Sequence, residues 1–159
     1  MSVRRNIIIA VVLTIFGVAC YFGYGIVYTA RHIPEAYAAW DTGTILIEYM
    51  KLHDGKWPSS WDDLLSVMSS DSGGKIEFHG AKAGDTNYAL SLRKKVAIDW
   101  KFDPARNDQI SPVTRPNGTR FPIVWEGAEP NEMIHAYLKA SMNTNAPKSR
   151  QEDAAGDSR

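Results

Sequence analysis

The chain opens on a long apolar run, and shorter segments of mixed polarity follow it. No charged residue occurs from Ile7 to Tyr28. As an α-helix this run would be about 33 Å long, which matches the hydrocarbon core of a bilayer at ~30 Å. We therefore predict a membrane-spanning helix at residues 7–28 and a lipid bilayer as its environment.

The charges beside the run indicate its orientation. Arg4 and Arg5 precede it, whereas only Arg31 and the mostly neutral His32 follow it. Because basic residues are retained on the cytoplasmic side, residues 1–6 are predicted to be cytoplasmic and the rest of the chain extracytoplasmic, as in a single-pass protein of the inner membrane. Signal-peptide cleavage after the small residues before Cys20, or lipidation at Cys20, remains an alternative.

A second helical pattern covers residues 34–52. Pro34 and Glu35 suit the first turn of a helix, and Gly43 is the only helix breaker before Leu52. The apolar residues of this helix cover more than half of its circumference, which is more than one packed sheet face requires. Either another element of the chain or a partner protein must therefore cover it.

One flank of this helix is a candidate partner surface. It consists of Ala36, Ala39, Gly43, Leu46 and Met50. The small residues would allow a second helix to approach closely, and a nearby membrane span would confine any partner to the same thin layer. The expected partner is another membrane or envelope protein. The alternative is that a C-terminal helix of the same chain covers the flank.

The helix is predicted to end in a turn built on Gly55, Trp57 and Pro58. Gly55 can adopt the left-handed conformation of a helix cap, and Pro58 prevents the helix from resuming. Ser60 then suits the N-cap of a shorter helix that carries Asp62 and Asp63 in its first turn.

The remainder of the domain, up to residue 142, alternates apolar and polar residues and is predicted to form a small antiparallel sheet with one wet face. The expected strands are at residues 75–79, 88–92, 96–102, 109–114 and 121–125, with Asn117-Gly118 as a tight hairpin turn. Asn131 is predicted to cap a C-terminal helix that packs on the sheet or beside the first helix. That helix has one face formed by Ile134, Tyr137, Leu138 and Ser141.

These patterns predict an α+β domain at residues 34–142. Residues 143–159 are polar, contain almost no apolar side chain, and are predicted to be a disordered tail. The charges of the whole chain balance, with 18 basic and 18 acidic residues, so the composition does not favour nucleic-acid binding.

No pattern in the sequence is typical of a catalytic, cofactor or metal site. The histidines are His32, His53, His79 and His135, and no two of them have ligand spacing. Asp62 and Asp63 are adjacent carboxylates, but on a helix they would point about 100° apart, and the helix dipole explains them. We therefore predict no enzymatic activity and identify no small-molecule ligand.

Residues 47–60, with the sequence IEYMKLHDGKWPSS, carry a resemblance to a known family. An apolar helix, a soluble helix, a Gly-x-aromatic-Pro turn and a short acidic helix occur in this order in the pseudopilins of type II secretion, and the major G-type pseudopilin is most similar. Trp57 takes the aromatic position of the turn. The resemblance implies a pilin-like domain, with a soluble helix packed on a small antiparallel sheet.

The chain departs from this family where filament assembly would be encoded. Prepilins carry a Gly-Phe processing site before the apolar segment and a glutamate at the fifth mature position. Here Val3 to Ile7 contain no such glycine, and no acid precedes Glu35. We therefore expect a non-enzymatic, membrane-anchored pilin-like interaction or assembly module. The alternatives are an atypical pseudopilin of a type II secretion system and a small envelope enzyme with an unrecognised site.

Overall fold

The computed structural model describes residues 2–69, 76, 78–80, 86–106 and 111–144. Its elements are α1 (Ser2–Leu52), α2 (Trp61–Ser69), α3 (Thr86–Lys95), β1 (Ala97–Ile98), β2 (Val113–Thr114) and α4 (Pro130–Thr144). The chain is therefore mostly helical, and a two-stranded antiparallel sheet accompanies the helices.

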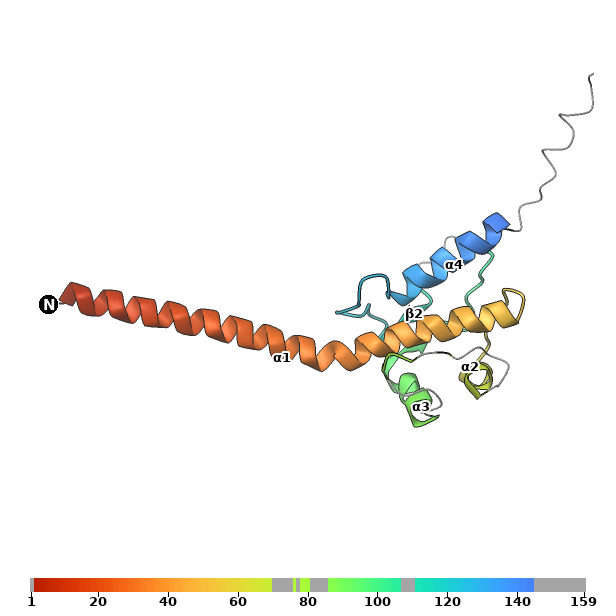
Figure 1. The fold of residues 1–159 in the computed structure, drawn as a ribbon, viewed down its shortest axis with the longest axis horizontal. Helices are drawn as coiled ribbons and strands as arrows, with labels where there is room; N and C mark the ends of the chain where they lie inside the picture. The colour runs from red at the N-terminus through yellow and green to blue at the C-terminus, as the bar shows by residue number, and fades with distance from the viewer. Residues whose placement is uncertain (1, 70–75, 77, 81–85, 107–110, 145–159) are drawn as a thin grey trace, which may run out of the picture.

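Helix α1 is continuous over 51 residues and divides into two environments. Its first half protrudes from the rest of the chain, and its second half lies inside a small head formed by the other elements (Figure 1). The protruding half holds an apolar window that is long enough to cross a membrane, and none of that window is buried by the protein. Among the described residues, α1 is the one helix with this property.

The predicted start of a separate helix at Pro34 is wrong, because Pro34 lies inside α1. A proline there removes one backbone hydrogen bond and crowds the preceding turn. A single proline can bend a helix rather than end it, because the neighbouring turns keep their own backbone hydrogen bonds. The proline instead accounts for the change of direction between the two halves of α1 in Figure 1.

The core of the head is arranged around the second half of α1. Helix α4 lies on one side of it, and α2 and α3 lie on the other (Figure 1). The largest fully buried apolar side chains come from all four helices and from the strand region: Ile45, Leu46, Met50, Leu64, Leu92, Val96, Val113 and Ile134. The wide apolar arc of the soluble half of α1 is thus covered within the chain.

The sheet is much smaller than predicted. Residues 88–92 belong to helix α3, and residues 121–125 form no strand. Ile76 and Phe78 are described without strand pairing, while Lys75, Glu77 and residues 107–110 lie outside the described residues. The error at α3 has a simple cause: Tyr88 and Leu92 are spaced by four, which suits a helix face as well as a strand, and the intervening Leu90 is exposed.

Strands β1 and β2 pair in the register Ala97 with Thr114 and Ile98 with Val113. The predicted strand at residues 96–102 stops early because the chain turns at Asp99, whose carbonyl accepts the N–H of Phe102 at 3.2 Å. The turn after β2 carries Gly118 at a φ of 78°, and its N–H donates to the Arg115 carbonyl at 2.9 Å.

Asn131 has a different task from the predicted N-cap. Its side-chain oxygen accepts the N–H of Val113 at 2.9 Å, and its amide donates to the Val113 carbonyl at 3.0 Å. The cap of α4 is Glu129, whose carboxylate accepts the N–H of Glu132 at 2.7 Å. Helix α4 packs against α1 as expected, with Ile134 and Leu138 buried, and it continues to Thr144. From residue 145 the predicted tail lies outside the described residues.

The turn after α1 has the predicted geometry. Gly55 has a φ of 77°, and its N–H donates to the carbonyl of Met50 at 2.8 Å. Pro58 is buried, and the indole N–H of Trp57 donates to the carbonyl of Asp99 at 2.9 Å. The turn therefore ties the end of α1 to the segment after β1. Ser60 caps α2 through the N–H of Asp63 at 3.4 Å.

We predict that Gly55→Val lowers the free energy of unfolding by about 1 kcal/mol or more, because a β-branched residue is strained at positive φ. Denaturant unfolding of the full chain in detergent micelles, followed by circular dichroism, measures this. Lys56→Val is the matched control on the same turn, where the side chain is exposed and φ is not positive. Equal midpoints for the two variants would contradict the assignment of Gly55 as the cap.

Candidate functional site

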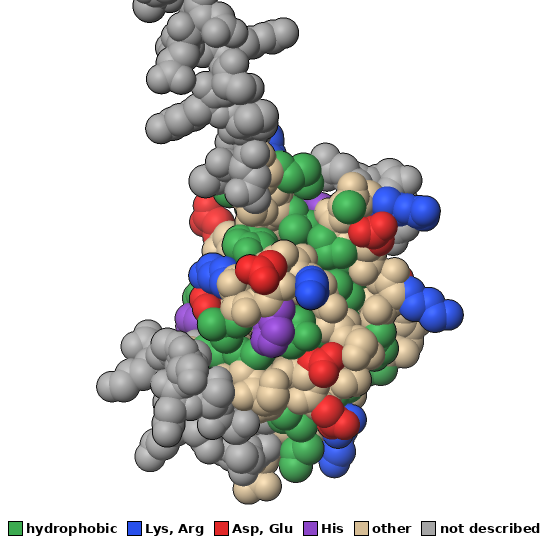
Figure 2. Space-filling model, turned by 90° about the vertical axis from the view of Figure 1, so that its right-hand side faces the viewer, with side chains coloured by type: hydrophobic (Ala, Val, Ile, Leu, Met, Phe, Trp, Pro, Cys, Tyr) green, Lys and Arg blue, Asp and Glu red, His purple; other side chains and the backbone are tan. Residues whose placement is uncertain are grey.

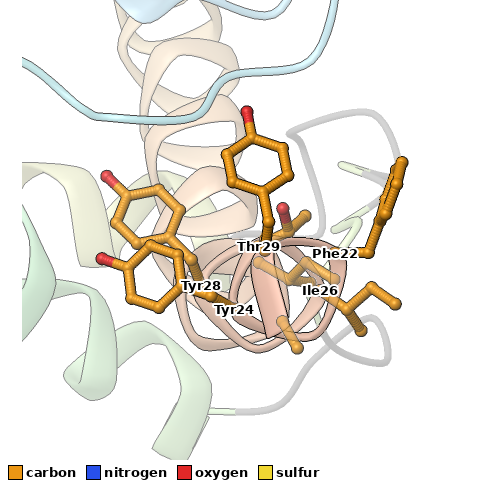
Figure 3. Close-up of a pocket in the computed structure, with 9 residues that line it drawn as sticks. Phe22, Tyr24, Ile26, Tyr28 and Thr29 are labelled. Atoms are coloured by element: carbon orange, nitrogen blue, oxygen red, sulfur yellow. The ribbon is translucent and has the colours of Figure 1, made fainter. Parts of the chain in front are cut away.

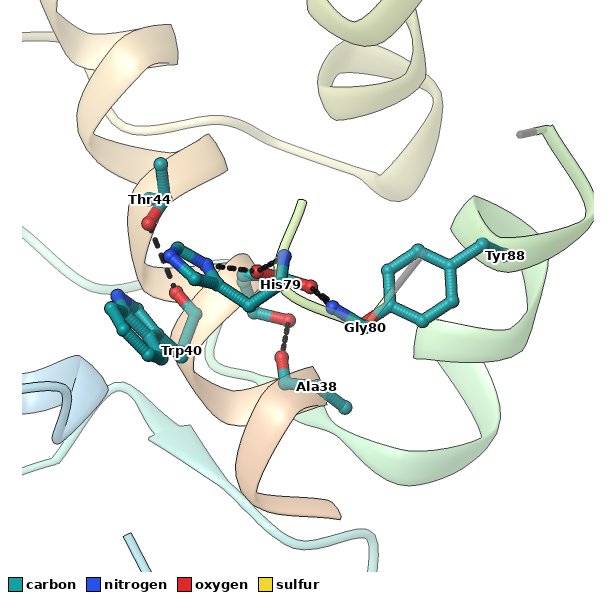
Figure 4. A network of polar contacts seen from close by, with 8 residues as sticks. Ala38, Trp40, Thr44, His79, Gly80 and Tyr88 are labelled. Carbon is teal, nitrogen blue, oxygen red and sulfur yellow. Dashed lines mark hydrogen bonds and ion pairs between the residues drawn. The ribbon is translucent and has the colours of Figure 1, made fainter. Parts of the chain in front are cut away.

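Asp41 is the most unusual side chain of the head. At helical spacing Asp41 shares one polar face with Thr44, Glu48 and Lys51, but in the structure it is fully buried. Its cover comes from residues 78–80 and from α3, which lie across this face of α1 (Figure 4). Among the described residues, the buried polar side chains are Asp41, Thr42 and Asn131, and all three are hydrogen-bonded.

The Asp41 carboxylate accepts hydrogen bonds on both oxygens. Oδ1 lies 2.9 Å from the backbone N–H of His79 and 2.9 Å from its ring Nδ1. Oδ2 accepts the N–H of Gly80 at 3.0 Å and the hydroxyl of Tyr88 at 2.6 Å. Because a carboxylate only accepts, Nδ1 of His79 carries the hydrogen in this contact. One side chain of α1 thus holds three residues that are distant in sequence.

Two further contacts fix the geometry around Asp41. The ring of His79 stacks on Trp40 with centroids 3.5 Å apart and planes 13° apart (Figure 4). Gly80 passes so close to Tyr88 that an added Cβ would overlap the tyrosine hydroxyl. Glycine is therefore required at residue 80 by space rather than by backbone angle.

Tyr88 remains a hydrogen-bond donor over the whole physiological pH range. Burial, followed by the hydrogen bond to Asp41 and its negative charge, raises the pKa of the Tyr88 phenol well above its usual value. A phenolate beside a buried carboxylate would place two negative charges in contact.

The Asp41 cluster comprises Asp41, His79, Gly80 and Tyr88. Its hydrogen bonds attach residues 79–80 and α3 to α1, which is a structural role. Both carboxylate oxygens accept hydrogen bonds from donors of the protein itself. The cluster thus satisfies a buried charge, which would otherwise cost several kcal/mol. In the part of the chain that the structure describes, no group of three His, Cys, Asp or Glu side chains could hold a metal ion.

The adjacent acids Asp62 and Asp63 lie in the first turn of α2, and the positive charge of His53 acts on Asp63. Asp63 accepts the N–H and the hydroxyl of Ser59, each at 2.7 Å. These hydrogen bonds hold the pKa of the Asp63 carboxyl below its usual value. Asp63 therefore belongs to the turn that starts α2, as the helix-terminus interpretation implies.

The candidate partner flank lies inside the head. Ala36, Ala39, Leu46 and Met50 are buried, and Gly43 faces α4, where an added Cβ would lie 3.1 Å from Cα of Pro130 and 3.4 Å from Sδ of Met133. The sequence left open whether a partner protein or the C-terminal helix of the same chain covers this flank. In the structure the C-terminal helix, α4, covers it. The small residues of this flank allow α4, rather than a partner, to approach α1.

The described surface includes an open groove and a cavity. The groove lies along the protruding half of α1, where Tyr24 and Tyr28 stack on one side of the helix and Phe22 points to another (Figure 3). The cavity, of about 310 Å³, lies at the start of α4, with Arg120, Glu132 and His135 among its lining residues. Neither contains a buried polar side chain without a partner, so neither has the features of a formed ligand site.

The described side chains at the end of the head opposite the protruding helix are mixed in charge. Acidic, basic, histidine and hydrophobic side chains alternate over the face in Figure 2. Such a surface gives no electrostatic reason to attract a polyanion or a polycation.

No known protein family, no curated protein and no solved structure matches the chain. The geometry described above therefore carries the functional argument by itself.

Sequence analysis missed the Asp41 cluster because its members have no local pattern. His79 and Tyr88 lie 38 and 47 residues from Asp41, in segments that were expected to be strands. A weak signal was present: Asp41 follows Ala38, Ala39 and Trp40, which is an unusual surrounding for an exposed carboxylate.

We predict that Tyr88→Phe lowers the free energy of unfolding by about 1–3 kcal/mol at neutral pH, because Oδ2 of Asp41 loses a buried donor. The raised pKa of Tyr88 also makes the free energy of unfolding depend on pH. Above about pH 10 the unfolded chain releases the tyrosine proton and the folded chain keeps it, so wild-type stability falls by up to about 1.4 kcal/mol per pH unit.

Denaturant unfolding between neutral pH and about pH 11 measures both effects, and the Tyr88→Phe variant should lack this component of the alkaline slope. Tyr137→Phe on α4 is the control, since it removes another partly buried tyrosine hydroxyl. Parallel stability curves for wild type and Tyr88→Phe would contradict the assigned hydrogen bond.

Proposed function

We propose that this chain is a single-pass membrane protein whose head is an interaction or assembly module of the cell envelope. The observation that carries the proposal is the continuity of α1, since one helix is fully exposed and apolar in its first half and forms the core of the head in its second. The head therefore cannot move independently of the span in the way a domain on a flexible linker does.

The proposed orientation places Ser2 to Asn6 in the cytoplasm and the head outside it. Arg4 and Arg5 support this orientation, because the other end of the apolar run is flanked by Arg31 alone. The stacked rings of Tyr24 and Tyr28 suit the interface at the extracytoplasmic end. The inner membrane of a cell envelope is the compartment that this topology favours.

A pilin-like arrangement of the head is part of the proposal. In its support, a protruding apolar helix continues into a packed helix, a glycine-capped turn follows at Gly55, and the short capped helix α2 comes next. The sheet of two short strands is smaller than the resemblance implies. Assembly would proceed through the protruding halves of α1, which offer an uncovered helix to neighbours in the membrane.

The alternatives have less support. An atypical pseudopilin would need a means of entering a filament other than the missing glutamate, since no acid precedes Glu35. An envelope enzyme would need a site other than the Asp41 cluster, whose carboxylate is occupied by donors from the protein itself. An envelope enzyme would also not require the span and the head to share one helix.

The orientation is tested by proteolysis. We expect protease added outside spheroplasts to digest the chain after Arg31 and to leave a short membrane-embedded stub, because the two N-terminal arginines hold the other end inside. Protein detected with an N-terminal tag should show the stub, and opening the membrane should shorten it further. A head that resists protease until the membrane is opened would overturn the orientation.

Assembly through a rigid helix is tested by insertion after Ala30. Four glycines there would uncouple the head from the span, whereas four alanines would keep the helix and add about one turn. A photo-crosslinking amino acid at Phe16 reports neighbours of the protruding half in the native membrane. We expect a discrete protein adduct from wild type and from the alanine variant, and a strongly reduced yield from the glycine variant. Equal yields from both insertions would contradict the need for continuity.

A further inference from the structure

The segment between β2 and α4, residues 115–129, is attached to α1 directly after the apolar span. Arg115 forms a two-point contact with Glu35: Nη2 donates to Oε1 at 3.2 Å, and Nε lies 3.2 Å from Oε2. The second contact is held by charge rather than by a well-aligned hydrogen bond, since Oε2 has no hydrogen-bond partner in the structure. Trp125 packs on Tyr37 with ring centroids 5.6 Å apart.

These contacts set the height of the segment above the bilayer. At 1.5 Å per residue, Glu35 lies about 10 Å beyond Tyr28 along α1. The polar headgroup layer is about 5–7 Å thick on each side of the hydrocarbon core. From its attachment at Glu35 the segment extends over the part of the protruding half of α1 that lies next to the head (Figure 1). The segment, which includes the turn at residues 115–120, is therefore directed from Glu35 toward the headgroup layer.

The bend in α1 brings the same side of the head toward the membrane. In Figure 1 the bend is concave on the side that carries α4 and residues 115–129. Pro34 lies one residue before Glu35, so the change of direction occurs where the segment is attached. A straight helix would hold this turn farther from the bilayer surface.

The turn itself is rigid and exposed. The Asn117 side-chain oxygen accepts the N–H of Thr119 at 3.1 Å and its hydroxyl at 2.7 Å. The N–H of Arg115 donates to the Thr119 carbonyl at 2.9 Å and closes the turn. Because these bonds fix the backbone beforehand, binding a surface would cost little further conformational entropy.

The charges at this level suit lipid phosphates. Arg120 is exposed at the end of the turn, and Arg31 is exposed on α1 one turn before Glu35. Arg115 is already neutralised by Glu35, whereas Arg31 and Arg120 are exposed. Arg120 also lines the cavity at the start of α4, together with the acids Glu129 and Glu132. Arginine binds phosphate oxygens through paired N–H groups.

We propose that the turn at residues 115–120, together with Arg31, binds the phospholipid headgroups of the membrane that α1 spans, and that this contact fixes the tilt of the head. The inference rests on the proposed membrane span. It adds a second attachment of the head to the same bilayer, made by a surface that is far from α1 in sequence.

Depth-dependent fluorescence quenching tests the proposal in the full chain, reconstituted in vesicles of phosphatidylcholine and phosphatidylglycerol. Cys20 is the only cysteine and lies in the span, so a fluorophore on it reports insertion through spin labels on the acyl chains. In a Cys20→Ser background, Pro116→Cys places the fluorophore on the turn. Lys56→Cys, on the exposed turn after α1, is the matched control.

We expect headgroup spin labels to quench the fluorophore at residue 116 several-fold more strongly than at residue 56. Arg120→Glu should reduce the quenching at residue 116 severalfold, whereas Lys139→Glu, an exposed change on α4, should leave it unchanged. Equal quenching at residues 116 and 56, with Cys20 quenched from the acyl chains, would overturn the headgroup contact and keep the span. An unchanged signal in Arg120→Glu would overturn phosphate binding by this arginine. A Cys20 fluorophore that acyl-chain labels do not quench would overturn the span and the contact together.

Discussion

Backbone hydrogen bonding along α1 is the constraint on which the rest of the structure depends. Each interior turn of a helix satisfies its own N–H and C=O groups, whereas a helix end leaves its last carbonyls without intrahelical partners. The helix therefore continues past Pro34 into the head and bends instead of breaking. Once it continues, its soluble half presents a wide apolar surface, and α2, α3 and α4 are placed where they cover that surface.

The Asp41 cluster shows how a polar group is accommodated inside that arrangement. Packing α3 and residues 78–80 against α1 would bury an unsatisfied charge, unless each oxygen of Asp41 met a donor. The backbone of His79 and Gly80 supplies two donors, and Tyr88 supplies a third. The carboxylate thereby specifies which segment lies on this face of α1, a choice that apolar packing alone would leave open.

The sequence predicted the elements that depend on local chemistry. The apolar run, the end of α1 at Leu52, the left-handed Gly55 and the Ser60 cap are all encoded within a few residues of where they act. The sheet and the Asp41 cluster depend on distant partners. The spacing of Tyr88 and Leu92 fits a strand or a helix equally well, and in the folded chain tertiary packing favours the helix α3. The partner flank could not be assigned because only the position of α4 shows that Gly43 meets Pro130.

The side chain of Asn131 has a consequence for how copies of this protein coexist. Val113 directs its N–H and C=O away from β1, and a strand edge of this kind invites another chain to add a strand. Asn131 occupies both groups with one amide, as a neighbouring strand would. An open strand edge is therefore a site at which chains can aggregate edge to edge. A single buried asparagine thus occupies the Val113 edge of the sheet, where another strand could otherwise pair.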